Sequence, residues 1–101
     1  MESNFSSAGC TATKHAYKRA KQRLGWSKSA LNNMMPRAHE LGMKQRDANA
    51  VLRKFFKKLR AKSDQQINNI RIYGQVVYFF HNHVLVTVYQ IPTRYNRYLQ
   101  V

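Results

Sequence analysis

The chain changes character near residue 62, and this change limits the folds open to it. Residues 14–62 contain 15 of the 18 Lys and Arg residues, and apolar residues recur there at helical spacing. Residues 63–101 contain three Arg and one Asp, a net charge of +2, and are rich in β-branched and aromatic residues, which favour strands. Helices followed by strands are typical of the α+β class. The sequence therefore predicts an α+β fold in which two or three N-terminal helices pack on a three- to four-stranded antiparallel sheet.

Three helices are expected in the basic part of the chain. The first covers residues 14–24, with Thr13 as its N-cap and a glycine just after its end. The second covers residues 29–41, where Pro36 requires either a kink or a start in the turn just before it. The third covers residues 47–62, with an apolar stripe on one face and basic residues on the other.

The second part of the chain is predicted to form strands. They cover residues 67–73, 75–80 and 84–91, with a fourth candidate at 94–99. Gly74 and the segment 81–83 mark the turns between them. The run 76–80 is apolar on both faces, which is typical of a central strand covered on both sides.

The N-terminal residues 1–12 are small and polar and show no periodicity, so we expect a flexible leader before a single α+β domain over residues 13–101. The single cysteine, Cys10, excludes an internal disulfide and a cysteine-based zinc site, and no metal or other cofactor is expected. No apolar run reaches the roughly 20 residues of a membrane span. The N-terminus also lacks the apolar core of a signal peptide, so a cytoplasmic location is expected.

The net charge of +14 is the strongest functional signal, because it predicts a polyanionic partner. Nucleic acid is the first candidate, ahead of an anionic membrane surface and an acidic protein. A solvated basic surface without a partner is the alternative. The sequence contains no glycine-rich phosphate loop, no paired acidic residues and no zinc-finger spacing. A two-carboxylate or metal-dependent nuclease is therefore not expected.

The first helix carries the most specific group of candidate residues. His15, Arg19 and Arg23 lie at i, i+4 and i+8 and form one stripe beside the apolar face. An imidazole transfers protons near neutral pH, and two guanidinium groups beside it can hold a phosphate. A solvated basic stripe is the alternative interpretation. The residues expected to contact the nucleic-acid backbone are Lys14, Lys18, Arg53, Lys54, Lys57, Lys58 and Arg60.

The order of these features resembles the small ribonuclease toxins of the barnase–EndoU–colicin–RelE type, and similar short proteins of phages and mobile elements. The resemblance is carried by the segments Thr13–Arg23, Ile70–Gly74 and Leu85–Tyr89. In that group, N-terminal helices pack on an antiparallel sheet, RNA lies across the sheet and the first helix, and the RNA 2′-OH attacks its own phosphate without a metal. The resemblance implies catalytic roles for His15, Arg19, Arg23 and Thr87, with Tyr89 as a further candidate. The chain lacks a glutamate base like that of barnase.

Three functions remain open on this basis. The first is a metal-independent, toxin-like endoribonuclease with His15 as general acid or base, which would need an acidic neutralising protein as a partner. The second is a non-enzymatic nucleic-acid-binding protein of a phage or mobile element. The third is an interaction protein whose basic face binds an acidic protein. RNA is the expected ligand of the first two, with DNA or the ribosome as alternatives.

Overall fold

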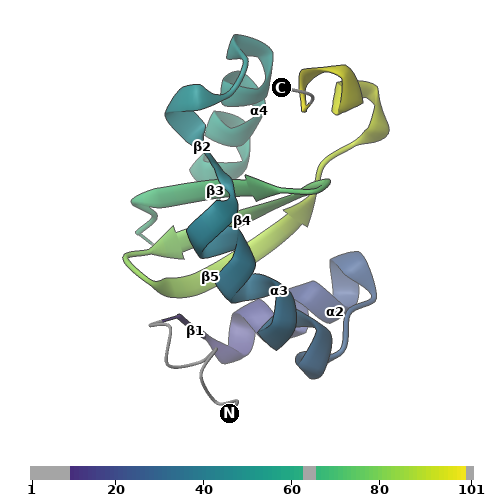
Figure 1. Cartoon of the computed structure of the whole chain (residues 1–101), viewed down its shortest axis with the longest axis vertical. Coiled ribbons are helices and arrows are strands. Elements are labelled where there is room, and N and C mark those ends of the chain that lie inside the picture. Colours follow the sequence, from purple (N-terminus) through teal and green to yellow (C-terminus); the bar gives the residue numbers. More distant parts are fainter. Residues whose placement is uncertain (1–9, 63–65, 100–101) are drawn as a thin grey trace.

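A five-stranded sheet with the strand order β1-β5-β4-β3-β2 separates two groups of helices (Figure 1). The computed structural model describes residues 10–62 and 66–99. In chain order the elements are β1 (Thr11–Ala12), α2 (Lys14–Leu24), α3 (Lys28–Leu41), β2 (Met43–Lys44), the 3-10 helix η1 (Gln45–Asp47), α4 (Ala50–Ala61), β3 (Asn69–Tyr73), β4 (Val76–His81), β5 (Val84–Gln90) and the 3-10 helix η2 (Thr93–Tyr98).

The α+β class and the N-terminal helices agree with the prediction, but the predicted sheet was wrong in two respects. The sheet has five strands, and it is mixed, because β1 runs parallel to β5 while the other pairs are antiparallel. β1 and β2 have two residues each, too few for a periodicity to show in the sequence. The segment 94–99 is not a strand, since Thr93–Tyr98 forms η2.

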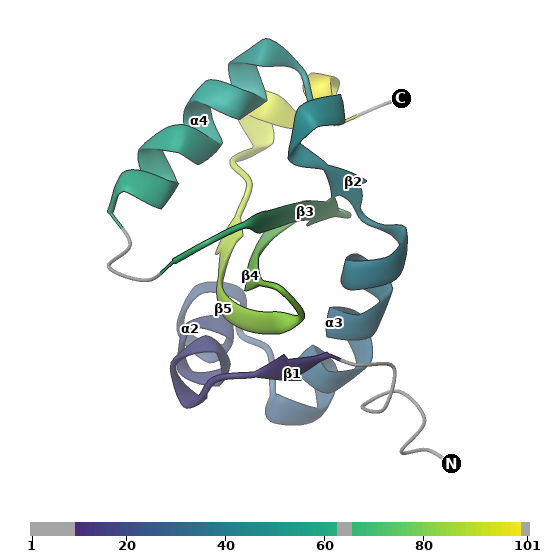
Figure 2. The same cartoon turned by 90° about the vertical axis from the view of Figure 1, so that its left-hand side faces the viewer.

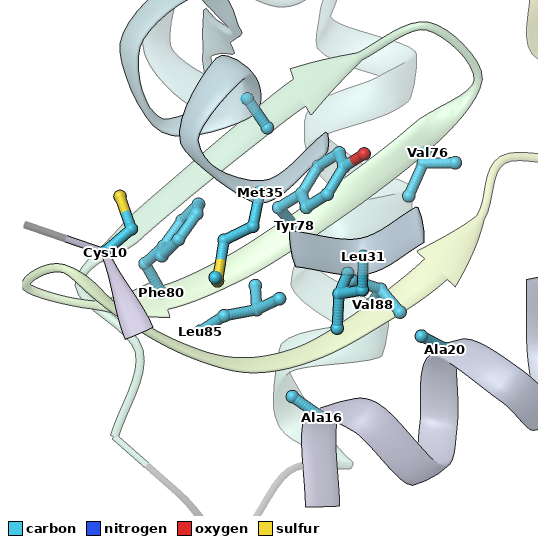
Figure 3. Packing of buried hydrophobic residues seen from close by; sticks show 11 residues of the cluster. Cys10, Ala16, Ala20, Leu31, Met35, Val76, Tyr78, Phe80, Leu85 and Val88 are labelled. Atoms are coloured by element: carbon cyan, nitrogen blue, oxygen red, sulfur yellow. The ribbon is translucent and has the colours of Figure 1, made fainter. Parts of the chain in front are cut away.

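The central strand is β4, as its two apolar faces predict. It pairs with β3 on one side and β5 on the other, and Val76–Phe80 are all buried. Tyr78 and Phe80 belong to the core that α2 and α3 cover, which Figure 3 shows. Val77 and Phe79 belong to a second core, which α4 and η2 cover from the other face. Each face of the sheet therefore has its own helical layer.

Side-chain caps explain where the helices begin. The Thr13 hydroxyl accepts a hydrogen bond from the Ala16 N–H at 3.0 Å, and α2 covers residues 14–24 as predicted. Ser27 caps α3 in the same way. α3 covers Lys28–Leu41, close to the predicted 29–41, and continues through Pro36, so the alternative of a later start is excluded. α4 begins at Ala50, after the cap Asn49, and the expected start at residue 47 falls in η1.

The predicted leader is in part a structural segment. Cys10 is 2% exposed within the core of α2 and α3, and burial raises the pKa of its thiol. The Thr11 N–H donates to the His83 carbonyl at 3.1 Å, and the Thr13 N–H donates to that of Leu85 at 3.0 Å. Thr11 and Ala12 therefore belong to the sheet, and Cys10 belongs to the core beside it. The rest of the predicted leader, residues 1–9, lies outside the described residues.

Helical periodicity assigns Leu41 and Val51 to buried stripes, but their exposed fractions are 66% and 40%. Leu41 is the last residue of α3 and Val51 lies in the first turn of α4. Both positions are at helix ends, where the chain leaves the sheet. None of the helices within residues 10–62 and 66–99 combines the length and apolar character needed to cross a membrane.

We expect Gly42→Ala to destabilise the fold strongly. Gly42 joins α3 to β2, and a Cβ there would overlap the Ala38 carbonyl and lie 3.1 Å from the Arg71 Cβ. Because the α3 backbone at Ala38 and the Cβ of Arg71 cannot move without disturbing their own packing, the unfolding free energy should fall by about 3 kcal/mol. Gly25→Ala is the matched control, because nothing lies within 4 Å of its Cβ and only its φ of +71° is unfavourable. It should cost about 1 kcal/mol. Urea denaturation measures both, and equal costs would contradict the close approach at Gly42.

Candidate nucleic-acid interface

Helix α2 lies against the sheet through two small side chains. Ala16 and Ala20 are 0% and 1% exposed and point into the core that contains Leu85 and Val88 of β5 (Figure 3). Alanine at both positions lets the helix approach the sheet closely. At 3.6 residues per turn, His15, Arg19 and Arg23 lie on one flank of this buried face, and Tyr17 lies on the other flank, beside α3. The outer surface of α2 connects the two flanks.

Arg23 connects α2 to the edge of the sheet. Its Nη1 donates to the Thr87 hydroxyl and to the Val88 carbonyl, both at 3.0 Å, and its Cζ lies 4.0 Å from the centre of the Tyr89 ring. β1 pairs with β5 only at Val84 and Leu85, so Arg23 supplies a hydrogen-bond donor further along the same edge. Three of the five predicted catalytic residues therefore meet, in contacts that hold the helix on the sheet.

His15 and Arg19 form a separate pair, apart from the contacts that Arg23 makes with β5. The Arg19 Nε–H donates to His15 Nε2 at 3.1 Å, and Arg19 Nη1 donates to the Gln22 side-chain oxygen at 2.8 Å. His15 is exposed. This contact engages Nε2, the ring nitrogen that faces Arg19.

The predicted catalytic set is thus divided along the helix. His15 and Arg23 are eight residues apart, a separation of about 12 Å along the helix axis. Thr87 is 5% exposed, and its hydroxyl already accepts from Arg23. Arg23 is exposed as well, but its contacts with β5 hold its guanidinium at the edge of the sheet.

A groove between α2 and α3 adds residues that sequence reasoning missed. Its volume is about 520 Å³, and its lining includes Tyr17, Trp26, Lys18, Lys21 and Lys28. Lys18 was predicted to contact a nucleic acid, whereas Trp26 was not among the predicted contact residues. The spacing in α2 places Tyr17 and Lys21 on one flank. The contribution of Lys28 depends on how α3 packs, and no pattern within either helix shows this.

The other predicted contact residues lie on α4, on the opposite face of the sheet from α2 (Figures 1 and 2). Arg53, Lys54, Lys57 and Lys58 are exposed. An open groove of about 390 Å³ lies on this surface and is lined by Gln45, Ala50, Arg53, Lys54 and Lys57. Arg60 differs from these residues, because its Nη2 donates to the Ile67 carbonyl at 2.6 Å and links α4 to the segment before β3. The basic residues of α2 and α4 therefore form two separate surfaces.

Within the described parts of the chain, no three His, Cys, Asp or Glu residues lie close enough together to hold a metal ion. In comparisons with known proteins, no family model, no curated protein and no solved structure matches the chain. The functional argument therefore depends on the residues themselves.

We expect Arg23→Ala to lower stability, because Thr87 and Val88 lose their hydrogen-bond donor and Tyr89 loses its cationic neighbour. The unfolding free energy should fall by about 1.5 kcal/mol. Arg19→Ala on the same helix should change it by no more than about 0.5 kcal/mol. Thermal or urea denaturation of the two variants tests this difference. If the two variants are equally stable, Arg23 does not stabilise the contact between α2 and β5.

Proposed function

We propose that the protein binds RNA across the exposed surface of α2. The observation that carries this proposal is the combination of charge and aromatic surface on this helix. Its 11 residues include five Lys or Arg and no acidic residue, and Tyr17 and Trp26 line a groove beside these basic residues. α4 is equally basic, but its groove has no aromatic lining. Lys14, Lys18 and Lys21 are exposed. An RNA strand supplies phosphates at a spacing that such a helix can contact.

The cost of this charge to the isolated helix supports the proposal. Lys14 and Lys18 are like charges at i, i+4, an arrangement that destabilises a helix by some tenths of a kcal/mol. Lys14 is also the first residue of α2, where the helix dipole disfavours a cation. A polyanion relieves both penalties. A helix serving only as a solvated face gains nothing from this arrangement.

The basic surface of α4 has a different role in this proposal. It lies behind the sheet from α2, and the lining of its groove contains no aromatic side chain. We assign it to long-range attraction, which raises the rate of encounter with a polyanion without fixing the strand. On this proposal RNA contacts Lys14 and Lys18 directly. Lys54 and Lys58 attract it by long-range electrostatics without touching it.

Two charge-matched double variants test this assignment. Lys14→Gln with Lys18→Gln removes an exposed i, i+4 pair from α2, and Lys54→Gln with Lys58→Gln removes an equivalent pair from α4. For the α2 pair, the slope of log K against log salt for single-stranded RNA should fall by about 1.4, or about 0.7 per lost phosphate contact. The α4 pair should change the affinity by roughly twofold. Fluorescence anisotropy of labelled RNA over a salt series measures both.

Equal losses in the two double variants would contradict a binding surface on α2. Failure of the wild-type protein to bind RNA at low salt would overturn the proposed function and favour an acidic protein as the partner. Equal affinity for single-stranded DNA would broaden the ligand to nucleic acid in general, because the phosphate contacts do not distinguish the two sugars.

The contact between His15 and Arg19 favours a second candidate function, a metal-independent endoribonuclease. In this mechanism the Arg19 guanidinium leaves the imidazole to hold a phosphate, which frees Nε2 of His15. Nε2 then takes the proton of the 2′-OH as its oxygen attacks the adjacent phosphorus. The bond from phosphorus to O5′ breaks, leaving a 2′,3′-cyclic phosphate and a 5′-OH that takes its proton from water. Arg23 and Thr87 act here only by positioning α2.

An RNA cleavage assay in EDTA distinguishes this candidate from binding alone. Wild-type protein should cut RNA to products with cyclic phosphate ends, and His15→Ala should lower the rate by about a hundredfold or more. Its RNA affinity should change little, because the lysines of α2 remain to contact the phosphates. DNA of the same sequence should remain intact, since it lacks the 2′-OH. If His15→Ala cleaves at the wild-type rate, or the RNA stays intact, the nuclease candidate is wrong and the binding proposal remains.

A further inference from the structure

The groove between α2 and α3 combines two kinds of side chain that a single-stranded nucleic acid uses together. Trp26 and Tyr17 present aromatic surface, and Lys18, Lys21 and Lys28 present three ammonium groups beside it. None of the residues that line the groove is acidic. Stacking of a base on an aromatic ring contributes about 1–3 kcal/mol, and the lysines can bind the phosphates on either side of that base.

The aromatic residues of the groove are held in position before any ligand binds. Trp26 follows Gly25, whose backbone is left-handed. The backbone N–H of Trp26 donates to the Ala20 carbonyl at 3.3 Å. The indole ring is half-buried and lies 6.4 Å from the ring of Tyr78, measured between centroids. The Tyr17 hydroxyl donates to the side-chain oxygen of Asn32, which ties its ring to α3. Little side-chain entropy therefore remains to be lost on binding.

One contact in the groove changes when a phosphate arrives. Lys28 Nζ lies 5.2 Å from the centroid of the Tyr17 ring, in a cation–π contact. A phosphate attracts this ammonium more strongly than the ring does. Movement of Lys28 towards a phosphate uncovers the face of Tyr17, so the same event creates a charge contact and exposes a stacking surface.

The groove is continuous with the pair formed by His15 and Arg19. Gln22 lines the groove and also accepts the hydrogen bond from Arg19. A strand with one base in the groove therefore crosses the outer surface of α2 and brings a neighbouring phosphate to Arg19. The α4 groove has lysines but no aromatic lining, so it cannot bind a base in this way.

We propose that the α2–α3 groove is a stacking subsite for an unpaired base of single-stranded RNA, with Trp26 as the platform and Lys21 and Lys28 on the adjacent phosphates. This inference rests on the proposed function, because it names where and in which form the RNA is held. A groove of about 520 Å³ is within the range of sites that enclose a nucleotide-sized ligand. Duplex RNA keeps its bases stacked inside the helix and does not fit the subsite.

The sole tryptophan of the chain makes the test specific, since any intrinsic tryptophan signal comes from Trp26. We would titrate the full chain with a single-stranded RNA of about ten nucleotides, a length typical of single-strand sites. Anisotropy of a label on the RNA reports total binding, and tryptophan emission reports the groove. We expect the emission to be quenched with the same midpoint as the anisotropy change. A sugar–phosphate oligomer without bases and a duplex RNA should bind without quenching.

Paired lysine variants provide the matched control. Lys21→Gln with Lys28→Gln should lower the RNA affinity about tenfold and move the midpoint of the quenching to a correspondingly higher RNA concentration, since two phosphate contacts are lost while Trp26 remains. Lys54→Gln with Lys57→Gln removes two lysines from the α4 groove and should leave the quenching of Trp26 unchanged. Both pairs keep Trp26, so neither result depends on whether a tryptophan variant folds.

The failures of this inference and of the proposed function can be told apart. If RNA binds by anisotropy but Trp26 emission does not change, the stacking subsite is wrong and RNA binding stands. Equal quenching by duplex RNA, or by poly-glutamate as an acidic peptide, would also overturn the subsite, because neither inserts a base. If no RNA binds by either signal, the proposed function fails and the inference fails with it.

Discussion

The burial of β4 on both of its faces determines the arrangement of everything around it. Val76–Phe80 has no polar face, so both sides of the sheet need a helical cover. α2 and α4 each contain five Lys or Arg and no acidic residue, and they lie on opposite sides of the sheet. The charge of the chain is therefore divided between two surfaces. A charge that looks continuous along the sequence is separated by the sheet in space.

The second constraint is the distance between α2 and the sheet. Ala16 and Ala20 allow the helix to lie close to β5, and this proximity lets Arg23 reach the Val88 carbonyl. Arg23 then acts as a structural bridge, and Lys14, Lys18 and Lys21 of α2 remain exposed for a ligand. The same close approach leaves Tyr17 on the side of α3, where the groove forms. One small-residue contact thus decides which residues hold the fold and which are available for binding.

Local signals in the sequence predicted the features that depend on neighbouring residues. Thr13 and a glycine gave the bounds of α2, and the apolar run of β4 predicted its central position. The sequence did not show β1 or β2, because a two-residue strand depends on its partner for its existence. Cys10 was assigned to a leader because its burial depends on the pairing of β1 with β5, which the sequence does not show. The same distinction holds for the candidate site. His15 and Arg19 lie on one helix, so their spacing predicted the pair, whereas the groove depends on the packing of α3 beside α2 and was not predicted.

The two candidate functions share one surface and differ in the behaviour of one side chain. In the free protein, Arg19 occupies Nε2 of His15, the atom that a general base needs. A protein that only binds RNA can keep this contact, with the phosphates on Lys14 and Lys18. A nuclease must transfer Arg19 to the phosphate, and Gln22, which also holds Arg19, connects that movement to the groove. A base in the groove would therefore lie beside Gln22, which is hydrogen-bonded to Arg19. On the nuclease proposal, release of His15 Nε2 by Arg19 would accompany the binding of that base.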